Sequence, residues 1–289
     1  MEQYHKTCLI CQSNKITDLA DFSSHHLSKC KKCGFVFAKK IPTQEELAVY
    51  YQGYGRDDYL SPVTIKRYNE LLDTMEKYRK TNRILDVGCG VGYFLEVAKK
   101  RGWEVYGTEF TEKAVCICEQ KGIAMQEGPL EVSHYEPESF DVLTSFEVIE
   151  HINNPKEEVA KFRCLLREGG LVYLTTPNFN SLLRYYLKDK YNVICYPEHL
   201  CYYTPKTIAR LFKNSGFKKL SVHSTGISLT RFKTSKKISA EKFVSQTSTD
   251  EQLRNKIETN KSLQLAKVMA NQTLTLFGCG DSLKAFFVK

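Results

Sequence analysis

The segment ILDVGCGVGYFLEVAKK, residues Ile84 to Lys100, combines a buried strand, a glycine turn and the start of a helix. Apolar residues at positions 84, 85 and 87 predict the strand, and the glycines Gly88, Gly90 and Gly92 let the backbone turn tightly. In open α/β sheets, ligands bind at the carboxyl end of such a strand. The segment therefore predicts a ligand site at the glycine turn.

Two acidic residues narrow the chemistry of that ligand. Asp86 precedes the glycines, and Glu109 ends the next predicted strand, where a carboxylate accepts hydrogen bonds from ribose hydroxyls. The glycine spacing is G-x-G-x-G, which differs from the dinucleotide spacing G-x-G-x-x-G. Asp86 would also repel a pyrophosphate, whereas it would attract a sulfonium ligand that carries an ammonium group. The pattern predicts S-adenosylmethionine as the ligand.

Working outward from this segment, strands and helices alternate from Arg83 onward. The alternation predicts a Rossmann-like α/β fold, with a doubly wound, mostly parallel sheet covered by helices on both faces. We expect strands at 83–87, 104–108, 123–126, 140–145, 170–175, 218–224 and 283–288, and helices at 92–101, 111–121, 155–167 and 205–215. Lys-rich helical sequence at about 235–277 predicts an insertion before the last strand.

Residues 83–177 resemble a class I S-adenosylmethionine-dependent methyltransferase. The likeness is carried, in order, by ILDVGCGVGYF, VYGTEFT, FDVLTSFEVIEHINNP and GGLVYLTTPN. The resemblance implies that the methionine end of the cofactor lies at the turn, that Glu109 holds the ribose, and that Phe110 packs on the adenine. It assigns cofactor binding to Asp86, Gly88, Cys89, Gly90, Glu109, Phe110, Leu130 and Phe146.

Two C-x-x-C pairs mark the first forty residues. Cys8 and Cys11 form the first pair, Cys30 and Cys33 form the second, and 18 residues separate the two pairs. Four thiolates at this spacing favour a closed tetrahedral zinc site, which would stabilise a segment too short to build its own core. A pair of disulfides is the alternative, and His25 or His26 could replace one thiolate. The eleven cysteines are an odd number in a long chain, which favours reduced thiols.

The predicted organisation has three parts. We expect a zinc-ribbon module at 1–40, a helical, tyrosine-rich linker and cap at 41–82, and a methyltransferase domain at 83–289 that contains the helical insertion. Thr43 and Glu46 have the spacing of a helix capping box. The order of these parts resembles methyltransferases of sugar and polysaccharide biosynthesis, including the nucleotide-sugar C-methyltransferases, over residues 1 to about 215.

Two histidines compete for the role of a base in methyl transfer. His151 belongs to FEVIEH, with Glu147 and Glu150, and these positions resemble those assigned a divalent metal in ubiquinone-pathway O-methyltransferases. His199 follows Glu198 after the fifth strand, where substrate loops lie, and an imidazole beside a carboxylate is a suitable base near pH 7.

The Y-x-E-H string of the sugar C-methyltransferases resembles Tyr196, Glu198 and His199. In that family these side chains serve the substrate. The resemblance implies that all three are catalytic, and we expect His199 to be the base with Glu198 assisting it. His151 is the alternative base.

Positive charge is concentrated near the C-terminus. Residues 205–289 hold 16 basic and 5 acidic residues, a net charge of +11, whereas residues 1–40 carry +4 and residues 41–204 carry −6. Such a surface attracts nucleic acid, a membrane or a phosphorylated small molecule. We expect phosphate contacts from some of Arg231, Lys233, Lys236 and Lys237.

These observations predict an enzyme that methylates an oxygen or carbon of a nucleotide-linked or polysaccharide-bound sugar, with structural zinc. The alternatives are an RNA methyltransferase and a ubiquinone-type O-methyltransferase. RNA-stacking motifs and the N-P-P-Y signature of adenine methylation are absent from the sequence. No apolar stretch is long enough to span a membrane and no signal segment begins the chain, so we expect a cytoplasmic protein.

Overall fold

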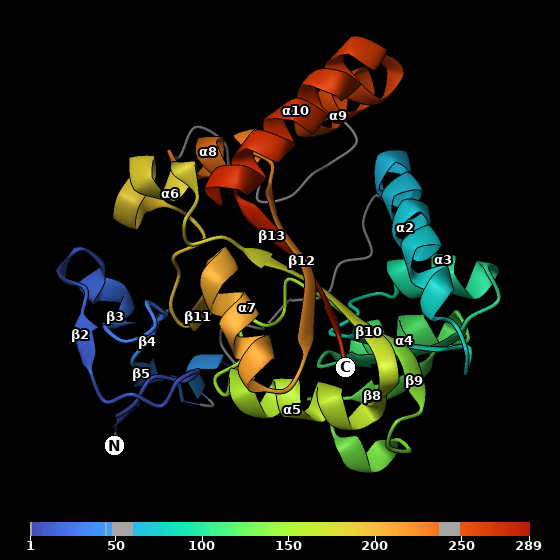
Figure 1. Ribbon diagram of the computed structural model, residues 1–289, viewed down its shortest axis with the longest axis horizontal. Helices are drawn as coiled ribbons and strands as arrows, with labels where there is room; N and C mark the ends of the chain where they lie inside the picture. Colours follow the sequence, from blue (N-terminus) through green and yellow to red (C-terminus); the bar gives the residue numbers. More distant parts are fainter. Residues whose placement is uncertain (1, 44, 48–59, 237–248) are drawn as a thin grey trace.

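The centre of the protein is a seven-stranded sheet with the strand order β12-β13-β10-β9-β6-β7-β8. The structure, a computed structural model, describes residues 2–43, 45–47, 60–236 and 249–289 (Figure 1). The five strands from β10 to β8 in this order pair in parallel, and β13 is antiparallel to both of its neighbours, β12 and β10. The mostly parallel sheet expected from the sequence is confirmed. Its strands are β6 (Arg83–Val87), β7 (Glu104–Glu109), β8 (Ala124–Glu127), β9 (Phe140–Phe146), β10 (Leu166–Pro177), β12 (Lys218–Thr225) and β13 (Ser282–Val288).

Helices cover both faces of this sheet. Helices α2 (Pro62–Met75), α3 (Tyr93–Lys100) and α4 (Glu112–Gln120) pack on one face, and α5 (Pro155–Leu165) and α7 (Pro205–Asn214) pack on the other. Alternation along β13 shows the two faces: Leu283 and Phe287 join the core under α5 and α7, whereas Phe286 packs toward α2 and α3. Short 3₁₀ turns are η1 (Ala20–His25), η2 (Glu76–Tyr78), η3 (Val132–His134) and η4 (Lys188–Lys190).

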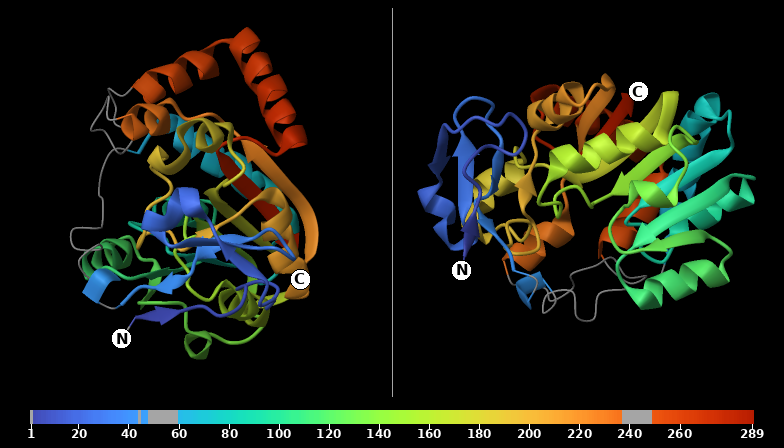
Figure 2. Two further views of the ribbon diagram at one scale, coloured as in Figure 1. Left: turned by 90° about the vertical axis from the view of Figure 1, so that its left-hand side faces the viewer. Right: turned by 90° about the horizontal axis from the view of Figure 1, so that it is seen from below.

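The N-terminal cysteine module, predicted at residues 1–40, shares a sheet with a strand from the C-terminal part of the chain. Strands β2 (Ile16–Asp18), β3 (Leu27–Cys30) and β4 (Val36–Ala38) form an antiparallel sheet whose fourth strand is β11 (Cys201–Tyr202). A separate pair joins β1 (Gln3–Tyr4) to β5 (Lys40–Ile41). Cys8, Phe35 and Phe37 share a core with α5 and α7. The module lies at the opposite end of the molecule from α3 and α4 (Figure 2).

A helical insertion lies between β12 and β13, as the sequence predicts. It contains α8 (Leu229–Ser235), α9 (Thr249–Thr259) and α10 (Lys261–Phe277), and residues 237–248 of the predicted insertion lie outside the described residues. Helix α9 contacts α2: the Ser61 hydroxyl donates to the Glu251 carboxylate over 2.5 Å, and Lys66 pairs with Glu258 at 2.6 Å. The insertion therefore bridges to the helix that precedes the first strand of the large sheet (Figure 1).

Helix α6 (Leu182–Leu187) follows β10. Within the described ranges, none of the helices combines the length and the apolar character that a membrane crossing requires. The tyrosines at 50, 51, 54 and 59 lie outside the described residues.

Candidate functional site

The glycine turn after β6 requires glycine at more than one position. Gly88 and Gly90 have φ values of +72° and +55°, which side chains rarely adopt. A Cβ at Gly88 would lie 2.5 Å from Cγ2 of Val148, whereas a Cβ at Gly90 would meet nothing within 4 Å. The backbone is therefore tightly packed at Gly88, and the space beside Gly90 is open to a ligand.

Glu109 lies at the end of β7 and faces this turn. Its Oε2 accepts a hydrogen bond from the Gly90 amide at 3.0 Å, and its Oε1 accepts from the Phe110 and Thr111 amides at 2.8 and 3.3 Å. These bonds fix the orientation of the carboxylate before any ligand arrives. A carboxylate has about four acceptor positions, so Glu109 still has capacity to accept from a ribose hydroxyl.

Asp86 is buried below the turn, with 2% of its surface exposed. Its Oδ1 accepts a hydrogen bond from the Thr144 hydroxyl at 2.7 Å. Burial raises the pKa of Asp86 to about 7, although the Thr144 bond opposes the shift. A cationic ligand nearby would favour the charged carboxylate and lower this pKa.

The other predicted cofactor residues differ in their exposure. Phe110 is 65% exposed, as expected for a ring that covers a ligand. Phe146 is half-buried and contacts the rings of Tyr68, Phe94 and Tyr173. Leu130 is only 2% exposed and lies in the core.

Cys89 also directs its thiol inward. Its Sγ lies 4.0 Å from Sγ of Cys118, which is fully buried on α4. A Cβ added at Gly107 would lie 2.7 Å from the Cys89 Sγ. The Cys89 side chain therefore packs in the interior, and the part of Cys89 that borders the turn is its backbone.

His151 and His199 lie together at the carboxyl edge of the sheet, with ring centroids 4.8 Å apart. Nδ1 of His151 donates to the Glu198 carbonyl over 2.7 Å, and Nδ1 of His199 donates to the Val193 carbonyl over 2.6 Å. Burial lowers the pKa of both histidines, and with the neighbouring His151 it lowers that of His199 to about 4. Both rings are therefore neutral at pH 7, with the lone pair on Nε2.

Glu150 completes this cluster. It is 2% exposed; its Oε2 accepts from the Thr176 hydroxyl at 2.9 Å, whereas its Oε1 is buried without a hydrogen-bond partner among the described residues. Burial, together with the charge of Glu147, raises its pKa well above the usual range. Glu150, His151 and His199 each place one possible metal-ligand atom within 4.8 Å of the other two. This arrangement could hold a divalent cation.

Glu147 does not join this group, although the sequence placed it beside Glu150 and His151. Its carboxylate pairs with the Arg231 guanidinium of α8 at 3.5 Å. The third residue of the group is His199 instead. Because His199 is 48 residues from His151 in the chain, the spacing within FEVIEH gives no signal for this grouping.

The three residues of the Y-x-E-H string face different neighbours. The Glu198 carboxylate accepts a hydrogen bond from the Cys195 thiol at 3.0 Å. Cys195, Glu198 and His199 also form a second group whose possible metal-ligand atoms lie close together. The Tyr196 hydroxyl instead donates to Glu46 over 3.3 Å, and its ring packs against His26 of the cysteine module. The structure therefore brings Glu198 and His199 together and directs Tyr196 toward the N-terminal part.

Glu46 itself belongs to the predicted capping box. The Thr43 amide donates to its carboxylate over 2.8 Å, and the Glu46 amide donates to Oγ1 of Thr43 over 3.2 Å. The predicted capping box is confirmed.

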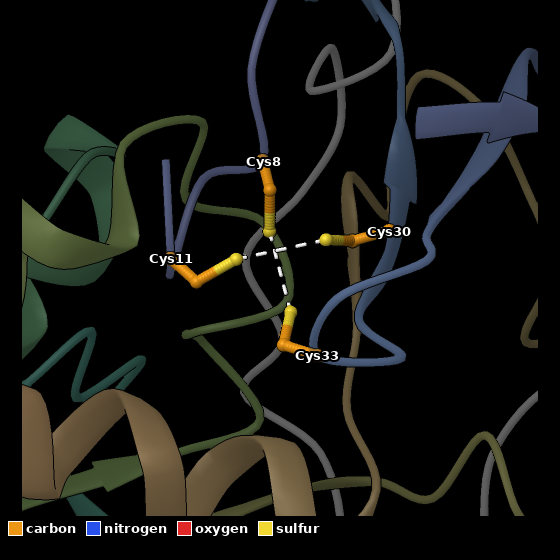
Figure 3. Close-up of side chains that lie close together, drawn as sticks. All are labelled: Cys8, Cys11, Cys30 and Cys33. Atoms are coloured by element: carbon orange, nitrogen blue, oxygen red, sulfur yellow. Dashed lines mark hydrogen bonds between the residues drawn. The ribbon is translucent and has the colours of Figure 1, made fainter. Parts of the chain in front are cut away.

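The four predicted metal-binding cysteines converge, with their sulfur atoms within 4.8 Å of one another (Figure 3). Sγ of Cys8 lies 3.5 Å from that of Cys33, and Sγ of Cys11 lies 3.6 Å from that of Cys30. Sulfurs about 2.3 Å from a tetrahedral zinc ion lie about 3.8 Å apart. The geometry fits such an ion, and these distances exceed the roughly 2.05 Å of a disulfide.

Hydrogen bonds link the cysteine module to the histidine loop. The Ala38 amide of β4 donates to the Leu200 carbonyl over 2.8 Å. The amides of Leu200 and Cys201 in turn donate to the Glu150 carbonyl over 2.8 and 2.9 Å. His199 is thus held between β4 and the loop that carries Glu150.

The predicted phosphate-binding residues already have partners within the protein. Arg231 donates to the Asp281 carbonyl over 3.1 Å in addition to pairing with Glu147. Lys236 donates to the Tyr186 hydroxyl over 3.2 Å, Lys233 also has a partner, and Lys237 lies outside the described residues.

Comparisons with known proteins cover the same segment. Residues 59–222 match a family described as a methyltransferase domain. A ubiquinone biosynthesis O-methyltransferase of Azoarcus sp. (strain BH72) is 28% identical over 156 residues, which cover 48% of this chain and 66% of that enzyme. One from Roseobacter denitrificans is 31% identical over 157 residues, 52% of this chain and 60% of that enzyme. The chain thus spans less than two thirds of the length of these relatives.

Among solved structures, a SAM-dependent methyltransferase from Archaeoglobus fulgidus superposes with a TM-score of 0.53 at 18% identity. The alignment covers 84% of this chain and 99% of that one. At this identity the likeness supports the fold alone. It agrees with the sheet order and the helical layers described above.

Proposed function

The chain belongs to this methyltransferase family and is an S-adenosylmethionine-dependent methyltransferase; on that premise we propose that it methylates a hydroxyl oxygen or an activated carbon of a sugar. The observation that carries the proposal is the pair of neutral imidazoles, His151 and His199, at the edge of the sheet that also carries the glycine turn. Each neutral ring has an Nε2 lone pair that can accept a proton from the methyl acceptor.

The residues of the turn fit S-adenosylmethionine, which supplies an electrophilic methyl group on a sulfonium centre. Glu109 would accept from the ribose hydroxyls, and Asp86 would face the ammonium group of the methionine end. Exposed Phe110 would cover the adenine, and Phe146 would border the methionine moiety. The open space beside Gly90 leaves room for the ligand.

His199 is the proposed base. Its Nδ1 proton is held by the Val193 carbonyl, so Nε2 is the atom that would accept the acceptor's proton. Because burial keeps the ring neutral, this lone pair is available at neutral pH. The imidazolium that forms would lie beside the Glu198 carboxylate, which would stabilise its charge.

The sugar is favoured by the order of the parts along the chain and by the Y-x-E-H string. A quinol or phenol acceptor is the second candidate, supported by the names of the relatives. It is also supported by Oε1 of Glu150, which has no hydrogen-bond partner among the residues described and could ligate a divalent cation with the two histidines. RNA is the third. The proposed sugar acceptor is a small molecule or a glycan that carries a phosphate group.

Transfer of labelled methyl from S-adenosylmethionine to a panel of nucleotide sugars, diphenols and RNA distinguishes these acceptors. We expect label in the sugars, in amounts that do not depend on added Mg²⁺. Label only in the diphenols, with a requirement for added Mg²⁺, would establish the second candidate instead. Label in RNA would exclude both.

We also propose that the cysteine module at 1–40 binds one structural Zn²⁺ through Cys8, Cys11, Cys30 and Cys33, that residues 41–82 serve as a cap, and that residues 83–289 form the catalytic domain. Metal analysis of reduced protein should find about one zinc per chain. Cys8→Ser should lose it, whereas Cys164→Ser, at an exposed cysteine, should retain it. Wild-type protein without zinc would contradict this assignment.

A further inference from the structure

The loop from Cys195 to His199 brings three possible metal ligands together. The His199 amide donates to the Cys195 carbonyl over 2.8 Å, and this bond closes a turn that carries both side chains. The Cys195 thiol donates to the Glu198 carboxylate over 3.0 Å. One possible ligand atom on each of Cys195, Glu198 and His199 lies within 4.8 Å of the other two. These three residues, the Cys195 group, place a thiol, a carboxylate and an imidazole side by side.

Hydrogen bonds to the backbone hold this loop in place. Nδ1 of His151 donates to the Glu198 carbonyl over 2.7 Å. The amides of Leu200 and Cys201, which follow the loop, donate to the Glu150 carbonyl over 2.8 and 2.9 Å. Because the backbone is fixed in this way, an ion would bind through small rotations of the three side chains, without refolding of the loop.

The types of ligand in the Cys195 group favour zinc. A thiolate and an imidazole are common ligands of Zn²⁺, whereas Mg²⁺ prefers oxygen ligands. Ligand atoms about 2.0–2.3 Å from a tetrahedral zinc ion lie roughly 3.3–3.8 Å apart. The observed separations, 3.0 Å between the Cys195 and Glu198 atoms and at most 4.8 Å overall, reach that geometry with shifts of about 1 Å. Three protein ligands leave the fourth position of the ion to water.

The Cys195 group is also more accessible than the group that contains Glu150. Cys195, Glu198 and His199 are each half-buried, so an ion can reach them from solvent. The other group, Glu150 with the two histidines, has no thiol, and Glu150 is 2% exposed. Zn²⁺ therefore has softer ligands and an easier path at the Cys195 group.

We propose that the Cys195 group binds a Zn²⁺ ion, separate from the ion proposed for the cysteine module, and that this second ion inhibits methyl transfer. The inhibition rests on the proposed function, in which Nε2 of His199 accepts the proton of the methyl acceptor. A neutral imidazole has one proton and one free lone pair. Zinc on Nε2 takes that lone pair directly, whereas zinc on Nδ1 displaces the ring proton to Nε2. In both cases His199 can no longer act as a base.

The binding test titrates ZnCl₂ into full-length protein that already contains the zinc of the cysteine module, in a calorimeter. We expect wild type to bind one further equivalent, with release of the Cys195 thiol proton to the buffer. Cys195→Ser should weaken this binding by roughly tenfold or more, because a hydroxyl is a poor ligand for zinc. Cys164→Ser, at an exposed cysteine of α5, is the matched control and should bind as wild type does.

The inhibition test measures transfer of labelled methyl before and after the second equivalent of Zn²⁺ is added, with an acceptor from the panel that takes up label. Each protein is compared with itself, so a difference in basal rate does not affect the result. We expect zinc to lower transfer by roughly tenfold or more in wild type and Cys164→Ser, because the base is lost. In Cys195→Ser the same zinc concentration should change transfer by less than about twofold.

The outcomes separate the site from its role. No second ion in wild type, or equal binding by wild type and Cys195→Ser, would overturn the site. Loss of the ion in Glu150→Gln with retention in Cys195→Ser would also overturn it, because the ion would then belong to the group around Glu150. Binding without inhibition would overturn the inhibitory role. Absence of transfer to every acceptor before zinc is added would contradict the proposed function, and the inhibitory role with it, whereas the binding test decides the site independently.

Discussion

The carboxyl edge of the sheet has two halves that are built differently. The cofactor half comes mostly from residues 84–110, with Thr144 and Phe146 added from β9. Its carboxylates are already oriented by hydrogen bonds, Glu109 by three amides and Asp86 by the Thr144 hydroxyl. The histidine half combines segments around 150 and 199, braced by β4, and Oε1 of Glu150 has no hydrogen-bond partner in the part of the chain that the structure describes. A locally closed half suits a ligand shared by many enzymes, whereas a half assembled over long range can vary with the acceptor. Damage to one half should therefore leave the other intact.

The largest difference between the effects on the two halves is expected from His199→Ala. Loss of a base lowers turnover by about 10²- to 10⁴-fold, and the affinity for S-adenosylmethionine should stay within about twofold. Steady-state kinetics and calorimetry on the same preparation measure both quantities. His134→Ala, at an exposed histidine of η3, is the control. If turnover persists, His151 becomes the candidate base.

Glu109→Ala should have the converse effect. Loss of hydrogen bonds between a charged acceptor and the ribose removes roughly 1.5–3 kcal/mol, so the Kd for S-adenosylmethionine should rise about tenfold to over a hundredfold. Glu112→Ala, three residues along in the exposed first turn of α4, should bind normally. An unchanged Kd in Glu109→Ala would mean that the cofactor does not bind at this turn.

The pH dependence of cofactor binding tests Asp86. Its carboxyl, with a pKa of about 7 before ligand binding, is charged above that pH and neutral below it. Affinity for the cationic cofactor should therefore be full near pH 8 and fall as the pH drops through 7, by about tenfold at pH 6. Calorimetry from pH 8 to pH 6 measures this slope. Asp86→Asn should bind weakly without it; the same slope in that variant would assign the titration to another group.

The smallest effect is expected from Tyr196→Phe. The Tyr196 hydroxyl faces Glu46 rather than the histidines, so its loss should change turnover by less than about twofold. The free energy of unfolding should fall by about 0.5–1.5 kcal/mol, the usual contribution of one hydrogen bond. Kinetics and denaturant titration measure the two. A tenfold loss of turnover would show that the tyrosine serves the acceptor, as the Y-x-E-H resemblance implies.

The halves also differ in how far the sequence predicts them. Strand, turn and helix follow one another within Ile84–Lys100, so local periodicity and glycine spacing are enough to place the turn, and the observed strands agree with the expected ones. The cysteine pairs are likewise local signals, and their four sulfur atoms converge. The pairing of Glu147 with Arg231 and the grouping of His199 with Glu150 depend on contacts 49 to 84 residues apart, which no short pattern encodes.

The pairing of β4 with β11 also sets an order for folding. Val36 and Phe37 find their partners Tyr202 and Cys201 about 165 residues later, so a chain emerging from the ribosome exposes β4 as an open edge until that segment is made. Contacts of such long range form slowly because a large loop must close first. Until then the edge is able to pair with other nascent chains. If the four cysteines bind zinc as proposed, the metal would order the module as soon as Cys33 is made and so reduce this risk of aggregation.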